Sequence, residues 1–222
     1  MIRVRSLEFR YPGTDFLLRI PDFQVGTREM VAVIGPSGSG KTTLLNLVAG
    51  ILVPEQGSVH CADSEVSTLS DAARRDFRIS RIGFVFQDFE LLDYLNVLDN
   101  VLHPYRITGA LKLTPKIRER ARDLLQQMGL GDKIQRRVER LSQGEKQRVA
   151  ICRALLPSPQ IVLADEATGN LDPRNKGHIL DLLFEAVQAH GSTLLAVTHD
   201  HELLPRFDRT VDFNDFLVKD GL

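Results

Sequence analysis

The sequence predicts an α/β protein with a mostly parallel sheet as its core, an antiparallel β subdomain and an inserted helical subdomain. Two observations carry this prediction. Short apolar runs typical of buried strands occur at 30–34, 161–164 and 193–197, and chemically active polar residues follow each run, as they do in open α/β sheets. Residues 88–156, by contrast, show mainly helical periodicity.

Short strands are expected in the first 30 residues, because apolar runs alternate there with turn signals. The runs 4–11 and 16–20 flank Pro12-Gly13-Thr14-Asp15, which predicts a β-hairpin. Met30-Val31-Ala32-Val33-Ile34 is rich in β-branched residues and predicts a buried strand. Residues 57–60 are expected to add one more short strand.

Three helices are marked by starting residues, a face of apolar side chains and a closing glycine near the far end. Their predicted extents are 41–50, 114–129 and 172–191, and the last two open with Thr114-Pro115 and Asp172-Pro173.

Composition limits the classes to which the chain can belong. Its 222 residues, 43% of them hydrophobic and 26% charged, suffice for one core or for a core with a subdomain. The net charge of −1 argues against a nucleic-acid-binding protein held by bulk positive charge. Cys61 and Cys152 lack metal-type spacing, which favours a reducing compartment. No apolar run approaches about 18 residues, and no signal peptide is expected. If the chain works at a membrane, another subunit would therefore hold it there.

Residues 35–42 match the pattern G-x-x-x-x-G-K-[ST] without a gap. Such a loop turns consecutive backbone N–H groups inward to form a nest for phosphate oxygens, and the helix that follows points its positive end at the same oxygens. Lys41 would add a charge near the β- and γ-phosphates, and the Thr42 hydroxyl is a candidate Mg²⁺ ligand. The loop therefore predicts a nucleoside triphosphate site. Its residues are Gly35, Pro36, Ser37, Gly38, Ser39, Gly40, Lys41 and Thr42.

An acidic pair, Asp165 and Glu166, follows the strand at 161–164. Beside a phosphate loop, Asp165 could hold Mg²⁺ through its water shell, and Glu166 could polarise the attacking water. A helix-capping or turn-forming pair is the alternative.

Two further polar residues stand after apolar strands. Gln87 follows the run at 81–86, where it could touch Mg²⁺ or the attacking water, unless it is an ordinary loop residue. His199 follows the strand at 193–197, where its imidazole could hydrogen-bond a γ-phosphate. A lone histidine would more often be a surface residue, but its place at a third strand end favours a function.

Leu141-Ser142-Gln143-Gly144-Glu145 opens a helix. Ser-x-x-Glu is an ordinary capping box, which alone explains the pattern. A helix N-terminus with a serine hydroxyl and a bare glycine backbone is also an anion site, so the two interpretations do not exclude each other.

In this order, these tracts resemble the ATP-binding-cassette (ABC) ATPases over essentially the whole chain. Residues 35–42 are similar to the Walker A loop, 161–166 to Walker B and 141–145 to the ABC signature. Gln87 is similar to the Q-loop glutamine and His199 to the switch histidine.

Two other positions extend the resemblance. Asn170-Leu171-Asp172 looks like the D-loop of the family. Tyr11 stands where the family places an aromatic residue under adenine, although a place in the hairpin core would also explain it.

A finer resemblance points to the branch with macrolide exporters, lipoprotein-release ATPases and the cell-division ATPase, through residues 82–87, 91–92 and 168–172. Gln143 and Glu145 depart from the common signature, which has Gly and often Gln at these positions. Glu occurs at the last position within this branch, whereas Gln143 would place a side chain near the partner nucleotide. Ala167 replaces a usual Pro after Glu166.

The resemblance implies a P-loop fold in which residues 1–87 and 157–222 form a RecA-like nucleotide-binding core with its β subdomain, and residues 88–156 form a helical subdomain that carries the signature. It implies that two copies close head to tail on ATP, each ATP lying between Walker A of one copy and Ser142 to Gly144 of the other. Residues implied in hydrolysis are Lys41, Gln87, Glu166 and His199, and those near Mg²⁺ are Thr42, Gln87 and Asp165. Residues implied in binding ATP are Tyr11, Gly35, Pro36, Ser37, Gly38, Ser39, Gly40, Lys41, Thr42, Thr43, Ser142 and Gly144.

The family also implies a partner, an integral membrane permease that the ATPase energises for export, extraction or related transport. The chain would then sit on the cytoplasmic face of the cell (inner) membrane and touch the membrane only through that partner. A helix of the permease would dock after Gln87, on side chains that a plain subdomain core would explain equally well. These are Phe89, Leu91, Leu92, Tyr94 and Leu95.

Three other classes of protein compete with this interpretation. A mechanotransmitting ATPase that moves no substrate, as in the cell-division relative, is the principal one. A DNA-repair or chromosome-type ATPase would carry a long coiled-coil insertion, and no sustained heptad run occurs here. A P-loop small-molecule kinase would not need Ser142 to Glu145.

Overall fold

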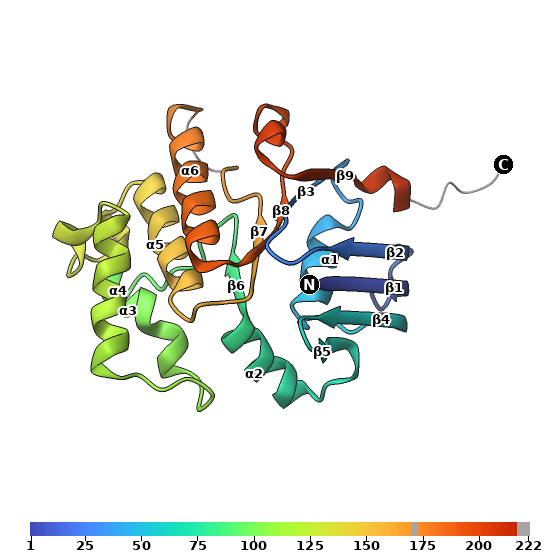
Figure 1. Ribbon diagram of the computed structural model, residues 1–222, viewed down its shortest axis with the longest axis horizontal. Helices are drawn as coiled ribbons and strands as arrows, with labels where there is room; N and C mark the ends of the chain where they lie inside the picture. Colours follow the sequence, from blue (N-terminus) through green and yellow to red (C-terminus); the bar gives the residue numbers. More distant parts are fainter. Residues whose placement is uncertain (170–172, 217–222) are drawn as a thin grey trace. The chain divides into compact units, whose positions relative to one another are not determined.

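The β-rich N-terminal part forms an antiparallel sheet in the order β2-β1-β4-β5. The computed structural model describes residues 1–169 and 173–216. Strands β1 (Ile2–Arg10) and β2 (Leu17–Val25) form the predicted hairpin, and β4 (Gln56–Cys61) is the additional strand expected there. Strand β5 (Ser64–Glu65) completes the sheet, in which Figure 1 shows β2, β1 and β4 side by side.

A bulge explains an irregular apolar pattern in β1. Buried side chains fall at Ile2 and Val4 and then at Leu7 and Phe9, so the period of two is broken once. The pairing with β4 shifts register between Arg5 and Glu8, and Ser6 has a φ of 46°. One extra residue in the strand therefore returns the apolar side chains to the buried face.

Parallel strands from the two ends of the chain form another set of paired strands. Strand β3 (Met30–Ile34) pairs in parallel with β8 (Thr193–Val197) on one side and with β9 (Arg209–Asp212) on the other. The predicted helix at 41–50 is α1 (Lys41–Val48), which follows β3 after a six-residue loop. Strand β9 has no counterpart among the predicted elements.

The chain divides into two compact units, Met1–Arg78 with Thr193 onward, and Ile79–Ser192. Each unit contributes parallel strands: β8-β3-β9 in the first, and β6 (Ile82–Val85) with β7 (Ile161–Asp165) in the second. This division differs from the expected one, which separates residues 88–156 from the rest. That functional division stays a prediction.

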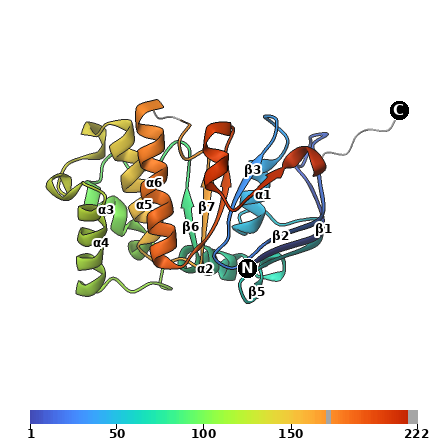
Figure 2. The ribbon, with the colours of Figure 1, turned by 45° about the horizontal axis from the view of Figure 1, so that its top comes forward.

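The second unit is mainly helical, as the periodicity of residues 88–156 predicts. Its helices are α3 (Val97–Leu102), α4 (Pro115–Gln127), α5 (Gln143–Leu155) and α6 (Pro173–His190). Helix α5 contacts α3, α4, α6 and strand β6, and Figures 1 and 2 both show it between α4 and α6. Its buried side chains include Val149, Ile151, Cys152 and Leu155, so α5 forms the centre of this unit.

Helix ends follow the predicted capping chemistry where the structure describes them. The Thr114 hydroxyl accepts a hydrogen bond of 3.3 Å from the Ile117 N–H, and Pro115 is the first residue of α4. Gly129 and Gly191 have φ values of 67° and 63°, just past the ends of α4 and α6. The predicted cap Asp172 lies outside the described residues.

One helix escaped prediction. Helix α2 (Asp71–Arg81) buries a single side chain, Phe77, and carries four arginines, so no apolar stripe marks it in the sequence. Arg81 is the last residue of this helix. The strand expected at 81–86 is therefore shorter in the structure, where β6 covers only Ile82–Val85. Short 3₁₀ turns link the main elements at Val66–Thr68, His103–Arg106, Gly131–Lys133, Val138–Arg140, His201–Arg206 and Phe213–Phe216.

Candidate nucleotide-binding site

The loop at 35–42 joins the end of β3 to the start of α1, which is the strand–loop–helix context that its motif requires. Gly38 and Gly40 have φ values of 77° and 104°, a region that residues with a side chain rarely adopt. These glycines therefore allow the backbone to curl around a small concave surface. The N-terminus of α1, with its partial positive charge, follows directly after these glycines.

Lys41 is held against this loop by the loop itself. Its ammonium donates hydrogen bonds to the carbonyls of Gly35 at 3.0 Å and Pro36 at 2.6 Å, and only 7% of the residue is exposed. Thr42, next along α1, is exposed, as a candidate ligand for a metal ion must be. The positive charge thus lies where the motif places phosphate oxygens.

The position of Tyr11 is compatible with both roles considered for it. Its ring packs against Phe9 and Phe16, with centroid distances of 4.8 and 5.5 Å, so it belongs to the aromatic end of the hairpin. Its hydroxyl lies 3.2 Å from Thr43 Oγ1, which ties the hairpin to α1. The ring is only half-buried, so one part remains accessible to a base.

His199 lies beside the same loop. An open pocket of about 360 Å³ is lined by residues of the first unit. The lining comprises Ile34, Gly35, Pro36, His199, His201, Asp212 and Asn214. The structure therefore brings the histidine at the end of β8 together with the phosphate loop, as expected for a residue that contacts a phosphate.

The acidic pair lies in the second unit, where β7 ends. Asp165 is the last residue of that strand, and Glu166 has a φ of 46°. A left-handed conformation costs a residue other than glycine about 1 kcal/mol or more, and such strain concentrates at functional sites. The Gly169 N–H donates to the Glu166 carbonyl at 2.8 Å, so a tight turn fixes the backbone that carries this carboxylate.

Gln87 and Glu166 converge within the second unit. A Cβ atom built on Gly169 would lie 3.4 Å from Gln87 Nε2 and 3.5 Å from Glu166 Oε2. Both side chains therefore reach the same point, although they are 79 positions apart in the sequence. Gln87 is exposed and follows the end of β6 by two residues.

The capping box at the start of α5 is formed in full. The Ser142 hydroxyl accepts a hydrogen bond of 3.3 Å from the Glu145 N–H, and Glu145 Oε2 accepts one of 2.8 Å from the Ser142 N–H. A hydroxyl that accepts one bond still has its own hydrogen to donate. Ser142 is exposed, so capping leaves it able to donate to an anion.

Two contacts of this region have no signal in the motifs. The Lys133 ammonium lies 2.5 Å from Glu145 Oε1, and the Arg153 guanidinium donates to the Phe89 carbonyl at 2.7 Å. Lys133 and Glu145 are 12 positions apart in the sequence, and Phe89 and Arg153 are 64 positions apart. Only the fold reveals these two contacts.

The residues fit a nucleotide with Mg²⁺. The loop offers backbone N–H groups, a buried ammonium and an exposed Thr42 hydroxyl, which are ligands suited to phosphate and to a hard cation. Among the described residues, no three His, Cys, Asp or Glu side chains form a cluster able to hold a metal alone. Mg²⁺ is commonly held by few protein ligands together with substrate phosphates and water.

A family model of the description "ABC transporter" matches residues 18–169. The chain belongs to the ABC transporter family. It is an ABC-type ATPase, an enzyme of the class that converts ATP and water into ADP and phosphate. The expected family, fold and enzyme class are therefore confirmed.

Curated ABC relatives support the finer resemblance. The lipoprotein-releasing system ATP-binding protein LolD of Gluconobacter oxydans (strain 621H) is 41% identical over 218 residues, 96% of this chain and 93% of its own length. The protein of the same name from Xanthomonas euvesicatoria pv. vesicatoria (strain 85-10) is 41% identical over 193 residues, 87% of this chain and 78% of its own. The resemblance to the branch with lipoprotein-release ATPases is thus confirmed.

Solved ABC structures share the fold. The dimeric post-hydrolysis state of the ATP-binding cassette MJ0796, bound to ADP and Pi, matches with a TM-score of 0.85 and 31% identity, over 96% of this chain and 94% of that one. CbiO1 from Clostridium perfringens, part of the ABC transporter complex cbiONQ, matches with a TM-score of 0.84 and 29% identity, over 95% and 83%. The D-loop tract Asn170-Leu171-Asp172 lies outside the described residues of this chain.

Proposed function

We propose that this chain is the ATP-hydrolysing subunit of a transporter whose membrane-spanning part is a separate permease. The observation that carries the proposal is the presence, in one chain, of a complete phosphate loop and of a capped helix end with an exposed Ser142. The names of the curated relatives favour a lipoprotein-releasing system. In the described part of the chain, no helix has the length and apolarity that a membrane crossing demands.

Each half of the candidate site has a separate task. The phosphate loop and Lys41 would hold the β- and γ-phosphates, with the Thr43 N–H as a further donor, and Tyr11 would support the adenine. Mg²⁺, when bound to Thr42, Gln87 and Asp165, would offset charge on the phosphates. The Glu166 carboxylate would orient water and take its proton, while the His199 imidazole would steady the γ-phosphate.

Two copies of the chain would share each ATP. The exposed Ser142 hydroxyl and the N–H groups at the start of α5 form a candidate anion site. The phosphate loop alone does not need this second site to hold a nucleotide. This site would close on the γ-phosphate bound by the other copy. Loss of the γ-phosphate on hydrolysis would remove that bond, and the copies would separate.

The permease would receive this movement, and the chain would reside on the cytoplasmic face of the inner membrane through that contact alone. Tyr94 is 72% exposed and follows Leu91 and Leu92 in the segment after Gln87, which supports this segment as the contact. Co-purification with an integral membrane protein tests this step. A partner that moves no substrate would favour the mechanotransmitting alternative.

The decisive experiment is light scattering on Glu166→Gln with Mg²⁺ and saturating ATP. We expect a dimer that returns to monomer when ATP is removed. The matched variant Glu166→Gln with Ser142→Ala should need more ATP to dimerise. A parent variant that stays monomeric at saturating ATP would contradict the shared site, and phosphate release that requires an acceptor molecule would instead indicate a kinase.

A further inference from the structure

The Glu145 carboxylate is divided between two partners at the start of α5. Oε2 accepts from the Ser142 N–H at 2.8 Å, and Oε1 lies 2.5 Å from the Lys133 ammonium. The two side chains of the ion pair are only 16% and 22% exposed, so water screens this pair less than a fully exposed one. Lys133 is the cation that holds the pKa of Glu145 below its usual value, and the carboxylate is therefore ionised at neutral pH.

This carboxylate creates an electrostatic conflict. It is hydrogen-bonded to the backbone of Ser142, the residue whose hydroxyl is a candidate donor to a γ-phosphate. A phosphate that binds at Ser142 would be repelled by this negative charge, which is a single hydrogen bond away from the Ser142 backbone. Gln, the common family residue at this position, can complete a capping box without any charge. The negative charge of Glu145, rather than its capping hydrogen bond, therefore requires compensation.

Lys133 supplies the compensating positive charge, and backbone hydrogen bonds hold it in position. It ends the 3₁₀ turn Gly131–Lys133, where its N–H donates to the Leu130 carbonyl at 3.0 Å and its own carbonyl accepts from the Arg136 N–H at 2.8 Å. These backbone bonds fix the point from which the side chain reaches Glu145. The ion pair thus follows from the fold of the segment between α4 and α5.

We propose that Lys133 is a positioning residue for the ATP-bound dimer: it neutralises Glu145, so that the capping box shapes the helix end without repelling the partner's γ-phosphate. The inference rests on the proposed function. Arg148 supplies a second positive group nearby, with Nη1 4.0 Å from the position of a Cβ on Gly144. Lys133, by contrast, acts directly on the carboxylate.

A double-mutant cycle in the Glu166→Gln background tests this role. The measured quantity is the ATP concentration at half-maximal dimerisation, by light scattering. Lys133→Met should raise it about threefold to tenfold, because the carboxylate is left uncompensated. In the presence of Glu145→Gln, the same Lys133→Met change should alter it less than about twofold, because no carboxylate remains to compensate.

Two controls separate this role from a structural one. Lys133→Arg keeps the charge and should behave as the parent, whereas Lys116→Met removes an exposed charge on α4 and should change dimerisation little. If the ion pair only held the structure together, Glu145→Gln alone would also break it. The double variant would then need as much ATP to dimerise as Lys133→Met alone.

The outcomes are distinct. Three results overturn the role of Lys133 while the dimer stands: an unchanged Lys133→Met, an equal effect of Lys133→Met in both backgrounds, or a double variant that needs as much ATP as Lys133→Met alone. A Glu166→Gln parent that never dimerises overturns both this role and the proposed function. Thermal unfolding of each variant shows whether the fold is intact, and a folded Lys133→Met that needs more ATP, rescued by Glu145→Gln, supports the proposal.

Discussion

Arg153 of α5 donates a hydrogen bond of 2.7 Å from Nη2 to the carbonyl of Phe89, and its Nη1 donates to the next carbonyl, that of Glu90. Phe89 and Glu90 have φ values of 63° and 49°, so one guanidinium fixes two consecutive left-handed residues. Burial lowers the pKa of Arg153 to about 10, which leaves the group charged at neutral pH. Helix α5 begins beside Ser142, and Phe89 follows Gln87 by two residues, so this contact links two candidate ATP-contacting segments.

We expect Arg153→Met to lower kcat about tenfold, because the segment after Gln87 loses the bonds that hold its strained backbone. Arg153→Lys should lie between this variant and wild type, since an ammonium lacks the planar fork that reaches both carbonyls. Steady-state phosphate release measures the effect. The exposed Arg118→Met on α4 is the control, and a normal kcat with a lower Tm would show that the contact serves stability alone.

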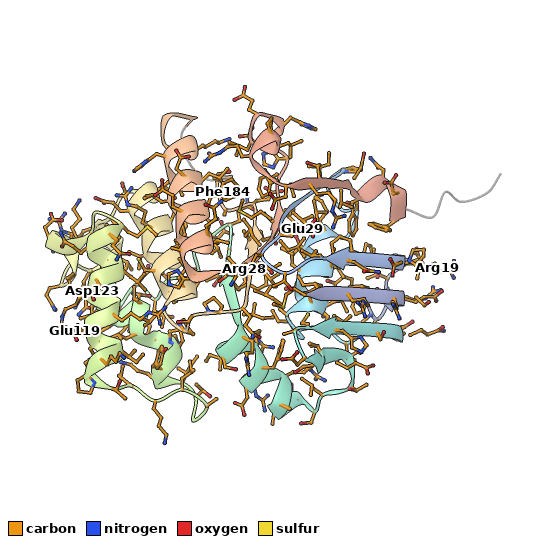
Figure 3. All side chains as sticks on the ribbon, in the orientation of Figure 1. Arg19, Arg28, Glu29, Glu119, Asp123 and Phe184 are labelled. Carbon is orange, nitrogen blue, oxygen red and sulfur yellow. The ribbon has the colours of Figure 1, made fainter. Side chains whose placement is uncertain are left out.

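Glu166→Gln should lower kcat about a hundredfold or more while ATP still binds, because an amide cannot accept the proton of the attacking water. Gln has nearly the same shape and the same difficulty with a φ of 46°, so the backbone strain is unchanged. Phosphate release and nucleotide binding are measured together. Glu119→Gln, on the exposed side of α4 in Figure 3, is the matched control, and turnover near wild type in Glu166→Gln would exclude the carboxylate as the base.

Tyr11→Phe should leave the KM for ATP within about twofold of wild type, whereas Tyr11→Ala should raise it about tenfold. The phenyl ring keeps the contacts with Phe9 and Phe16 and a face for adenine, and only the hydroxyl contact with Thr43 is lost. Alanine removes the face itself. Equal KM values for the two variants would limit Tyr11 to the hairpin core.

Elements with a local signal could be predicted from the sequence. The turn at residues 12–15 fixes the hairpin, the capping box fixes the start of α5, and the apolar run at 30–34 is β3 residue for residue. Strand β9 carries no such signal, because Arg209, Thr210 and Asp212 are exposed and only four residues pair with β3. Its place depends on an edge of the sheet that distant residues create.

The candidate site divides in the same way. Strand ends marked the polar side chains that are candidates for the site, and the fold brings His199 to the phosphate loop and Gln87 to Glu166. The contacts of Arg153 with Phe89 and of Lys133 with Glu145 could not be predicted, since they depend on how helices and turns pack. The left-handed backbone conformation of Glu166 could not be predicted either, because glutamate has no preference for that conformation.

Gly83→Ala should lower the free energy of unfolding by about 2 kcal/mol, because the new methyl group would overlap backbone rather than a movable side chain. A Cβ on Gly83 would lie 2.5 Å from the Ala154 carbonyl oxygen and 3.0 Å from Pro159 Cγ. Urea denaturation measures the change. Gly109→Ala is the control, since a Cβ there meets nothing within 4 Å, and equal effects of the two substitutions would contradict the close approach of β6 to α5.

The two thiols should resist Ellman's reagent at pH 8 until the chain unfolds. Burial raises the pKa of Cys61 and of Cys152 to about 12, so each is almost entirely in its unreactive protonated form. Cys61 lies in the first compact unit and Cys152 in the second, so single-cysteine variants report the opening of each unit separately. Gln127→Cys adds an exposed thiol as the fast-reacting control. If one native thiol reacts well below the urea concentration that exposes the other, the units open independently. Equal urea midpoints for the labelling of the two thiols mean that the units unfold together. Rapid labelling without urea would contradict the burial of the thiols.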